Sequence, residues 1–336
     1  MKFAILFPGQ GSQKVGMGLD LFEKTNTAKE LFQTCNNICK KELSKIFLHG
    51  PEEELNQTIN TQPAIVTVSC ALTLLLQEKL KDKNLKFTPF ACSGHSLGEF
   101  TALWFLKILS FEDLIKLVSI RGKLMQDTPK GKSKGSMAAI LNLSKEKIEE
   151  IISEKSEKGE KNYKNKIVIA NYNTPSQFVI SGEKELLQDL VEKIKLNNGK
   201  AIILPVSGAF HSPLMEEPSQ LFSLELDKIL PKSINNIPID LYQNCDGMPS
   251  KDYLQIKEKI KKQMTSSVYW TQTITNLVKD GLNAVIEIGP GKVLTGLVKK
   301  INPNIDCYNI FDLASLEEFT NDYEYKFQSK EHSKIT

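Results

Sequence analysis

One hexapeptide constrains the fold of this chain more than any other feature: residues 94–99 read Gly-His-Ser-Leu-Gly-Glu. The apolar run Phe90–Cys92 precedes it, and the helix-like segment Glu99–Leu109 follows it. Gly-x-Ser-x-Gly between a strand and a helix is typical of a nucleophile elbow, which holds the serine hydroxyl out near the positive end of the helix dipole. The sequence therefore predicts an α/β fold with Ser96 as catalytic nucleophile, and a plain strand–turn–helix connection is the alternative.

The composition is that of a water-soluble globular protein and argues against several functional classes. The 336 residues suffice for about two domains, and 40% are hydrophobic and 25% charged. A net charge of +3 gives no reason to expect a nucleic-acid partner. No run of about 18 apolar residues occurs, and Phe3–Phe7 stops at Pro8, too early for a signal peptide. We therefore expect a cytoplasmic protein without a membrane partner, or a plastid protein shown without its transit peptide.

The cysteines predict neither a metal centre nor a disulfide framework. The six cysteines are scattered, and only Cys35 and Cys39 have a spacing that brings them to one helix face. No second pair and no nearby histidine completes a zinc site. We expect reduced thiols and no metal.

Arg121 is the only arginine among 43 basic residues, the others being lysine. It falls in a helix that the capping-box pattern at Ser110 predicts up to about Gln126. Its spacing from Leu114 and Leu117 places it on the apolar face of that helix, where a guanidinium needs an anion. One interpretation is an internal ion pair. The other is recognition of a substrate carboxylate, which the two-pronged guanidinium suits better than lysine does.

Two glycine-rich stretches differ from nucleotide-binding fingerprints. Residues 8–13 follow the strand Lys2–Phe7, but Lys14 stands where a dinucleotide loop needs glycine. We expect this loop to bring backbone N–H groups close to a substrate. Residues 289–296 have the glycine spacing of a phosphate loop without its Lys-Ser/Thr pair, which favours a strand–turn–helix packing element.

A change of pattern after residue 128 predicts an inserted subdomain. The basic linker 129–135 leads into a β-α-β-β-α-β order, which is typical of a ferredoxin-like subdomain and contains a solvated loop over 154–166. We assign residues 129–206 to this subdomain, 1–128 and 207–316 to an α/β core, and 317–336 to a polar, frayed tail. The strands predicted in the insertion are 137–141, 167–171, 177–181 and 201–206, and its helices are 145–156 and 184–197. The core is predicted to have an amphipathic helix with a polar connection over 19–48, helices over 64–79, 214–226, 253–264 and 271–279, and strands over 239–242 and 284–288.

Elimination indicates His211 as the base that a serine nucleophile requires. The chain has four histidines. His332 lies in the tail and His49 in a polar turn, while His95 adjoins Ser96, where neighbouring side chains point apart. His211 lies among small residues in a loop at the return to the core. The alternative is a surface histidine without a catalytic role.

Six segments together resemble the malonyl-CoA:acyl carrier protein transacylase family. They are residues 7–13, 61–64, 94–99, 121–123, 208–212 and 287–292. Their order and spacing match over most of the chain, from residue 1 to about residue 300. The family's fold is an α/β-hydrolase-like large domain, built on a parallel sheet, with an inserted ferredoxin-like small domain. This agrees with the patterns described above.

The resemblance implies a role for each matching residue. Ser96 would attack the thioester carbonyl of malonyl-CoA with His211 as general base. The backbone N–H groups of Gln10 and Leu97 would stabilise the oxyanion. Arg121 would bind the malonyl carboxylate through both prongs of its guanidinium.

Three further positions concern the loops around the histidine. The resemblance implies that the main-chain carbonyl of Gln263 orients the histidine. Ser267 departs from the family pattern, which has proline there. Phe210 resembles the malonyl-selecting form of its loop, in which a bulky ring would crowd an α-methyl group and disfavour methylmalonyl.

The implied reaction is a ping-pong transfer of malonyl, through Ser96, to the phosphopantetheine thiol of acyl carrier protein, without a cofactor. We expect a monomer whose lysines dock that acidic partner. The candidates are Lys123, Lys130, Lys132, Lys134 and the cluster 257–262. Two other functions compete: a serine hydrolase with a downstream Asp/Glu–His pair, and a non-catalytic domain that binds acyl carrier protein.

Overall fold

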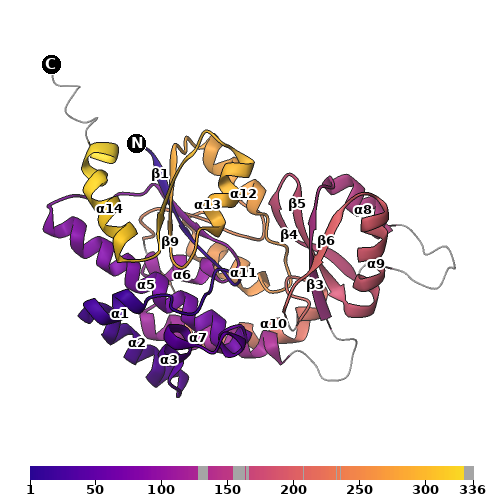
Figure 1. Cartoon of the computed structure of the whole chain (residues 1–336), viewed down its shortest axis with the longest axis horizontal. Helices are drawn as coiled ribbons and strands as arrows, with labels where there is room; N and C mark the ends of the chain where they lie inside the picture. The colour runs from indigo at the N-terminus through magenta and orange to yellow at the C-terminus, as the bar shows by residue number, and fades with distance from the viewer. Residues whose placement is uncertain are drawn as a thin grey trace.

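Two β-sheets with helices packed on them form the protein (Figure 1). The computed structural model describes residues 1–127, 135–153, 163, 166–206, 208–231, 233–234 and 236–328. One sheet has the strand order β10-β9-β1-β2-β7-β8, and the other has the order β4-β5-β3-β6. The four-stranded sheet and its helices lie at one end of the molecule, on the right in Figure 1.

The six-stranded sheet is parallel except at one edge, where β8 pairs antiparallel with β7. Its strands are β1 (Phe3–Phe7), β2 (Ala91–Gly94), β7 (Asp240–Tyr242), β8 (Pro249–Ser250), β9 (Ala284–Ile288) and β10 (Asp306–Ile310). The central strands β1 and β9 are buried along their whole length, as parallel strands covered on both faces must be. Phe7 pairs with Gly94, so the loop after β1 and the turn after β2 meet at one edge of the sheet.

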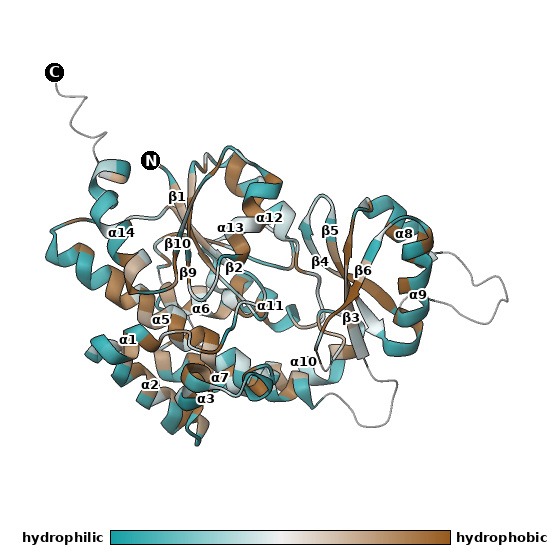
Figure 2. Cartoon of the chain, in the orientation of Figure 1, coloured by the Kyte–Doolittle hydropathy of each residue, from teal (hydrophilic) through white to brown (hydrophobic). Residues whose placement is uncertain are grey.

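Helices cover both faces of this sheet, with their apolar sides turned inward (Figure 2). On one face, Ala4 and Leu6 pack with α12 (Trp270–Lys279) and α13 (Val293–Ile301). On the other face, Phe3, Ile5 and Phe7 belong to a larger cluster with the helices that cover that face. These are α1 (Leu19–Lys24), α2 (Asn26–Cys39), α3 (Leu43–His49), α4 (Glu52–Leu55), α5 (Thr58–Asp82), α6 (Gly98–Phe105), α7 (Phe111–Gln126), α10 (Glu216–Ile229), α11 (Tyr253–Lys262) and α14 (Leu313–Tyr323).

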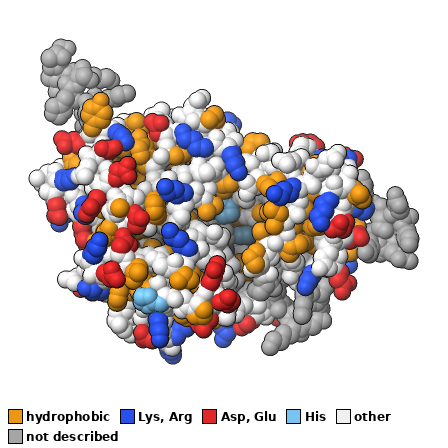
Figure 3. Space-filling model, in the orientation of Figure 1, with side chains coloured by type: hydrophobic (Ala, Val, Ile, Leu, Met, Phe, Trp, Pro, Cys, Tyr) orange, Lys and Arg blue, Asp and Glu red, His pale blue; other side chains and the backbone are white. Residues whose placement is uncertain are grey.

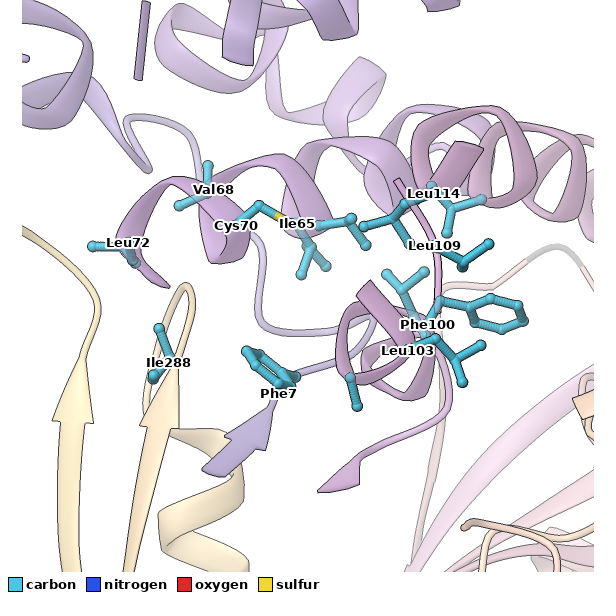
Figure 4. Packing of buried hydrophobic residues seen from close by; sticks show 14 of the residues in the cluster. Phe7, Ile65, Val68, Cys70, Leu72, Phe100, Leu103, Leu109, Leu114 and Ile288 are labelled. Carbon is cyan, nitrogen blue, oxygen red and sulfur yellow. The ribbon is translucent and has the colours of Figure 1, made fainter. Parts of the chain in front are cut away.

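The helix α5 is the centre of that larger cluster. Its residues Ile65 and Leu72 lie beside Phe7 and Ile288 of the sheet in Figure 4. Within the described residues, α5 is the one helix long and apolar enough to cross a membrane, but 89% of its most apolar stretch is buried inside the protein. The start predicted for this helix at Ala64 is wrong, because α5 begins at Thr58 and runs through Pro63. A proline within the first two turns removes only one backbone hydrogen bond.

The four-stranded sheet is antiparallel throughout. Its strands are β3 (Gly135–Leu141), β4 (Ile167–Thr174), β5 (Gln177–Glu183) and β6 (Lys200–Ile203), and its helices are α8 (Lys145–Ser153) and α9 (Lys184–Leu196). Ile148 and Ile194 are among the buried aliphatic residues with which the two helices cover one face. The strand predicted up to residue 206 ends at Ile203, because Pro205 cannot donate a ladder hydrogen bond. The linker predicted over 129–135 and the loop over 154–166 lie, except for residues 135, 163 and 166, outside the described residues.

Strand β4 joins the two parts of the molecule through the segment before α12. Val268 donates its N–H to the Ala170 carbonyl at 2.8 Å, and Tyr172 donates to the Val268 carbonyl at 2.9 Å. Ser267 donates its hydroxyl to the Ile169 carbonyl at 2.7 Å. The serine that departs from the resembled pattern thus adds a hydrogen bond that proline could not make.

Two predictions about helices are corrected. Residues 19–48 form three helices, because Thr25 caps α2 at its start and Lys40 ends it in a left-handed conformation. The polar tail predicted from Glu317 is wrong up to residue 328, since α14 extends to Tyr323 and one further helical turn follows it. Phe319 and Tyr323 lie one turn apart, and both are buried.

Glycine is required where β1, β2 and α6 meet. A Cβ on Gly98 would collide with the Phe7 carbonyl, and a Cβ on Gly94 would collide with the backbone of Gly98. Neither obstacle is a side chain that could rotate away. By contrast, a Cβ on Gly296 in α13 would meet nothing within 4 Å.

We therefore predict opposite effects for two matched substitutions. Gly98→Ala should lower the free energy of unfolding by at least about 3 kcal/mol, since backbone must move. Gly296→Ala should be neutral or raise it by up to about 1 kcal/mol, because alanine favours helix. Urea unfolding of the two variants tests this, and equal effects would contradict it.

Candidate active site

Ser96 lies at the tip of a strained turn between β2 and α6. Its φ of 50° is in the left-handed region, which is uncommon for a residue other than glycine. Asn244 fixes the turn, because its Oδ1 accepts the Ser96 N–H at 2.6 Å and its Nδ2 donates to the Gly94 carbonyl at 2.7 Å. The backbone of residues 94–96 is thereby held so that the hydroxyl faces the cavity.

His211 contacts the serine hydroxyl. Its Nε2 lies 2.7 Å from Ser96 Oγ, and its Nδ1 lies 3.0 Å from the Gln263 carbonyl and 3.1 Å from the Ser266 carbonyl. Carbonyl oxygens only accept, so Nδ1 carries the hydrogen and Nε2 is free to accept the serine proton. The place that a carboxylate takes in a Ser-His-Asp triad holds two main-chain carbonyls here.

Burial keeps His211 neutral. The ring is 3% exposed, and burial together with the nearby Arg121 charge lowers its pKa to about 3. Hydrogen bonds to the Gln263 and Ser266 carbonyls act in the opposite direction and are outweighed. A neutral imidazole at physiological pH is the form that a general base needs.

Arg121 reaches the same point from α7. It is 1% exposed, and its Nη2 donates to Ser96 Oγ at 3.1 Å and to Gln263 Oε1 at 2.9 Å. The guanidinium lies 5.3 Å from the centre of the Phe100 ring. Burial lowers its pKa to about 10, so it stays charged. No carboxylate within the described ranges forms an ion pair with it, although an internal ion pair was one of the two interpretations of its sequence position.

Two unpaired backbone N–H groups lie beside the serine. Those of Gln10 and Leu97 make no hydrogen bond within the part of the chain that the structure describes, whereas Gln10 Nε2 donates to Thr58 Oγ1 at 3.2 Å. The loop after β1 approaches the elbow so closely that a Cβ on Gly9 would collide with the His95 carbonyl. These N–H groups have the chemistry of an oxyanion hole.

A cavity of about 410 Å³ opens onto these groups between the two sheets. Figure 3 shows histidine atoms, in pale blue, inside the hollow between the two parts of the molecule. Ser96, His211, Arg121 and Gln10 line the cavity, and Phe210 lies in its wall. The sequence-predicted site residues therefore come together, with Leu97 and Gln263 directly behind this lining.

Several residues of the site were not predicted. Asn244 and Ser266 carried no sequence signal, since each acts through a contact with a distant part of the chain. Glu99 is 1% exposed and hydrogen-bonded to Gln263, and a lone acidic residue ahead of an apolar helix was an available signal. His95 is not a base for Ser96; its Nε2 lies 2.8 Å from Asn173 Oδ1 on β4.

The predicted docking lysines divide into three groups, the first being Lys123 alone, which is exposed on α7. Lys130, Lys132 and Lys134 lie outside the described residues. In the 257–262 cluster, Lys257 and Lys261 form ion pairs with Asp227 at 2.8 and 3.0 Å.

Comparison with known proteins places the chain in the acyl transferase class. Residues 4–308 match the family described as "Acyl transferase domain". Malonyl CoA-acyl carrier protein transacylases of Bacillus subtilis (strain 168) and Staphylococcus aureus (strain COL) are each 39% identical to it, over 94% of this chain and 95% and 97% of theirs. The chain belongs to the malonyl CoA-acyl carrier protein transacylase family.

Solved structures agree with this assignment. The transacylase of Clostridium perfringens has a TM-score of 0.84 at 36% identity, over 97% of this chain and 98% of that one. A malonyl-transacylase solved in complex with a type II PKS acyl-carrier protein has a TM-score of 0.86 at 32% identity, over 96% of this chain and all of that one. The mixed α/β fold with its parallel-rich sheet is that of these proteins.

The lowered pKa of His211 predicts how stability changes with pH. Between pH 7 and pH 5 the histidine takes up a proton in the unfolded chain but not in the folded protein, so acidification costs stability. Relative to the non-titrating variant His211→Gln, the wild type should lose about 2 kcal/mol over this interval. Urea unfolding at both pH values measures the difference. A constant difference would mean that the folded protein accommodates the imidazolium.

Proposed function

We propose that this protein transfers the malonyl group from malonyl-CoA to the phosphopantetheine thiol of acyl carrier protein, supplying fatty acid synthesis. One observation carries the proposal beyond acyl transfer in general: the buried guanidinium of Arg121 lies against the Ser96 hydroxyl and has no carboxylate partner within the described residues. An acyl group that brings its own carboxylate would supply the missing anion. The names of the relatives agree with this substrate.

In the first half-reaction, Ser96 Oγ attacks the thioester carbonyl carbon while His211 Nε2 takes the hydroxyl proton. The N–H groups of Gln10 and Leu97 stabilise the resulting oxyanion, a contribution worth about 10²–10³ in rate for each donor. The C–S bond then breaks, and His211 returns the proton to the CoA sulfur. Malonyl remains as an ester on Ser96.

In the second half-reaction, the phosphopantetheine thiol gives its proton to His211, and its sulfur attacks the ester carbonyl. The C–O bond breaks and Ser96 regains its proton, so the cycle is ping-pong and needs no metal or other cofactor. The main-chain carbonyl of Gln263 keeps the histidine oriented through both steps. Phe210 narrows the cavity wall against an α-methyl group, which favours malonyl over methylmalonyl.

The proposal also includes the division of the chain into domains, the location of the enzyme in the cell and its oligomeric state. The strand order β4-β5-β3-β6 and its antiparallel pairing support a ferredoxin-like subdomain over 129–206, inserted into an α/β-hydrolase-like core of residues 1–128 and 207–316. Residues 317–328 belong with the core, since α14 packs there. We place the enzyme in the cytoplasm as a monomer, with Lys123 among the docking residues for acyl carrier protein.

The two rival functions make different predictions about the site. A serine hydrolase would orient its histidine with a carboxylate, whereas His211 is oriented by two carbonyls. A non-catalytic binding domain would have no need for Ser96 in a strained turn within hydrogen-bonding distance of a neutral histidine. Both observations favour transfer.

Trapping the acyl-enzyme tests the proposal directly. Labelled malonyl-CoA should leave one label on the wild type and none on Ser96→Ala, and adding acyl carrier protein should move the label onto its thiol. Ser212→Ala is the matched control, because that hydroxyl donates to the Ala209 carbonyl and accepts from the Leu214 N–H, and it contacts neither Ser96 nor the His211 ring within the described residues. Release of free malonate without transfer would support the hydrolase instead.

Arg121 should determine acyl selectivity. Arg121→Lys loses the bidentate contact and Arg121→Ala loses the charge, so each should reduce malonyl transfer by about 100-fold or more. Acetyl transfer should fall less, or rise, because acetyl has no carboxylate. Parallel assays with malonyl-CoA and acetyl-CoA measure the ratio, and equal losses would make Arg121 a structural residue.

A further inference from the structure

Glu99 is a buried acidic residue for which the mechanism above has no role. It lies in the first turn of α6, directly after the elbow, and is 1% exposed. Its Oε2 accepts a hydrogen bond from Gln263 Nε2 at 2.6 Å, and its Oε1 accepts one from the Asn244 N–H at 3.4 Å. Burying a carboxyl group costs free energy, because the group loses its hydration, unless hydrogen bonds within the protein offset that loss.

The Gln263 side chain has its orientation fixed by three partners. Its Nε2 donates to the Ser96 carbonyl at 2.9 Å and to Glu99, while its Oε1 accepts from Arg121 Nη2 at 2.9 Å. A carbonyl and a carboxylate accept hydrogen bonds, and a guanidinium only donates them. Rotation of the amide by 180° would break all three contacts.

Gln263 thereby separates the Arg121 guanidinium from a carboxyl group whose pKa burial raises to about 7. Glu99 is the acidic group whose charge favours the charged form of Arg121, yet the two side chains form no ion pair. A direct ion pair would occupy the prongs of the guanidinium. With glutamine in between, Arg121 makes its side-chain hydrogen bonds through Nη2 alone within the described residues, and its Nε is buried without a partner.

We propose that Glu99 is a positioning residue that, through Gln263, holds the Arg121 guanidinium oriented and open to a substrate carboxylate. The inference rests on the proposed malonyl transfer and assigns a task to a residue that does not touch the substrate. It also explains why a neutral side chain, rather than a second acid, contacts the only arginine of the chain.

Glu99→Gln is the first test, because it removes the charge and keeps the shape. A glutamine at residue 99 can accept or donate, so it no longer fixes the Gln263 amide. The KM for malonyl-CoA should rise about tenfold or more, with a smaller change in kcat, and the malonyl-to-acetyl ratio should fall by a similar factor. A loss shared equally by both acyl groups, with KM unchanged, would indicate a merely structural role and overturn the proposal.

A second test moves the carboxylate from residue 99 to residue 263, which separates the effect of its position from the effect of its charge. Gln263→Glu would place an acid directly on Arg121 while the main-chain carbonyl that orients His211 remains. The double variant Glu99→Gln/Gln263→Glu has the net charge of the wild type with the carboxylate shifted to residue 263. Both should lose malonyl selectivity, because the guanidinium is then occupied. A double variant as selective as the wild type would overturn the proposal.

A binding readout keeps this test separate from the proposed function. Malonate should raise the Tm of the wild type by mass action, and should raise it less in Glu99→Gln and in Gln263→Glu. If the wild type formed no malonyl-enzyme but showed this pattern, the proposed function would fail and the positioning role would stand. Equal shifts in all three proteins would overturn the positioning role. Gln263→Glu retains Glu99, so it gives an answer even where Glu99→Gln does not fold.

Discussion

The close packing of three backbones at the edge of the parallel sheet is the constraint on which the site depends. Gly9, Gly94 and Gly98 lie where any side chain would collide with the main chain of a neighbouring segment. This packing forces the turn that holds Ser96 at a φ of 50°. It also brings to that turn the N–H groups of Gln10 and Leu97, which have no hydrogen-bond partner in the described part of the chain. Strain of this kind persists only where the surrounding structure enforces it, and Asn244, in the turn after β7, completes that enforcement.

The sequence was informative where a role depends on a local pattern. The elbow around Ser96 is a contiguous motif, and Arg121 stands out by composition and by its place on an apolar helix face. Asn244, Ser266 and the Glu99–Gln263 contact were not predictable, because each joins residues more than 50 positions apart. For the same reason the helix after β10 was missed: its aromatic residues pack on Phe3, at the other end of the chain, so the polar composition of that segment was misleading.

In the proposed mechanism, recognition of a carboxylate by Arg121 would be coupled to the strength of His211 as a base. Arg121 is the second cause, after burial, that lowers the pKa of His211. A carboxylate bound to the guanidinium would offset that charge, so the imidazole would become a better base when the acyl group carries an acid. Selection would then act on the chemical step as well as on binding. A lysine at residue 121 would supply a point charge, but not the planar guanidinium geometry that can hold a carboxylate and the serine hydroxyl together.

The position of β1 in the sheet has a consequence for how the chain reaches this state. This first strand pairs on one side with β2, but its other neighbour is β9, residues 284–288, which is synthesised much later than either. Until β9 arrives, one edge of β1 is unpaired and the apolar surface of α5 lacks part of its cover. Non-local pairing of this kind slows folding and exposes intermediates to aggregation. The apolar surface of α5 therefore stays partly exposed in the nascent chain until residues 284–288 have been synthesised.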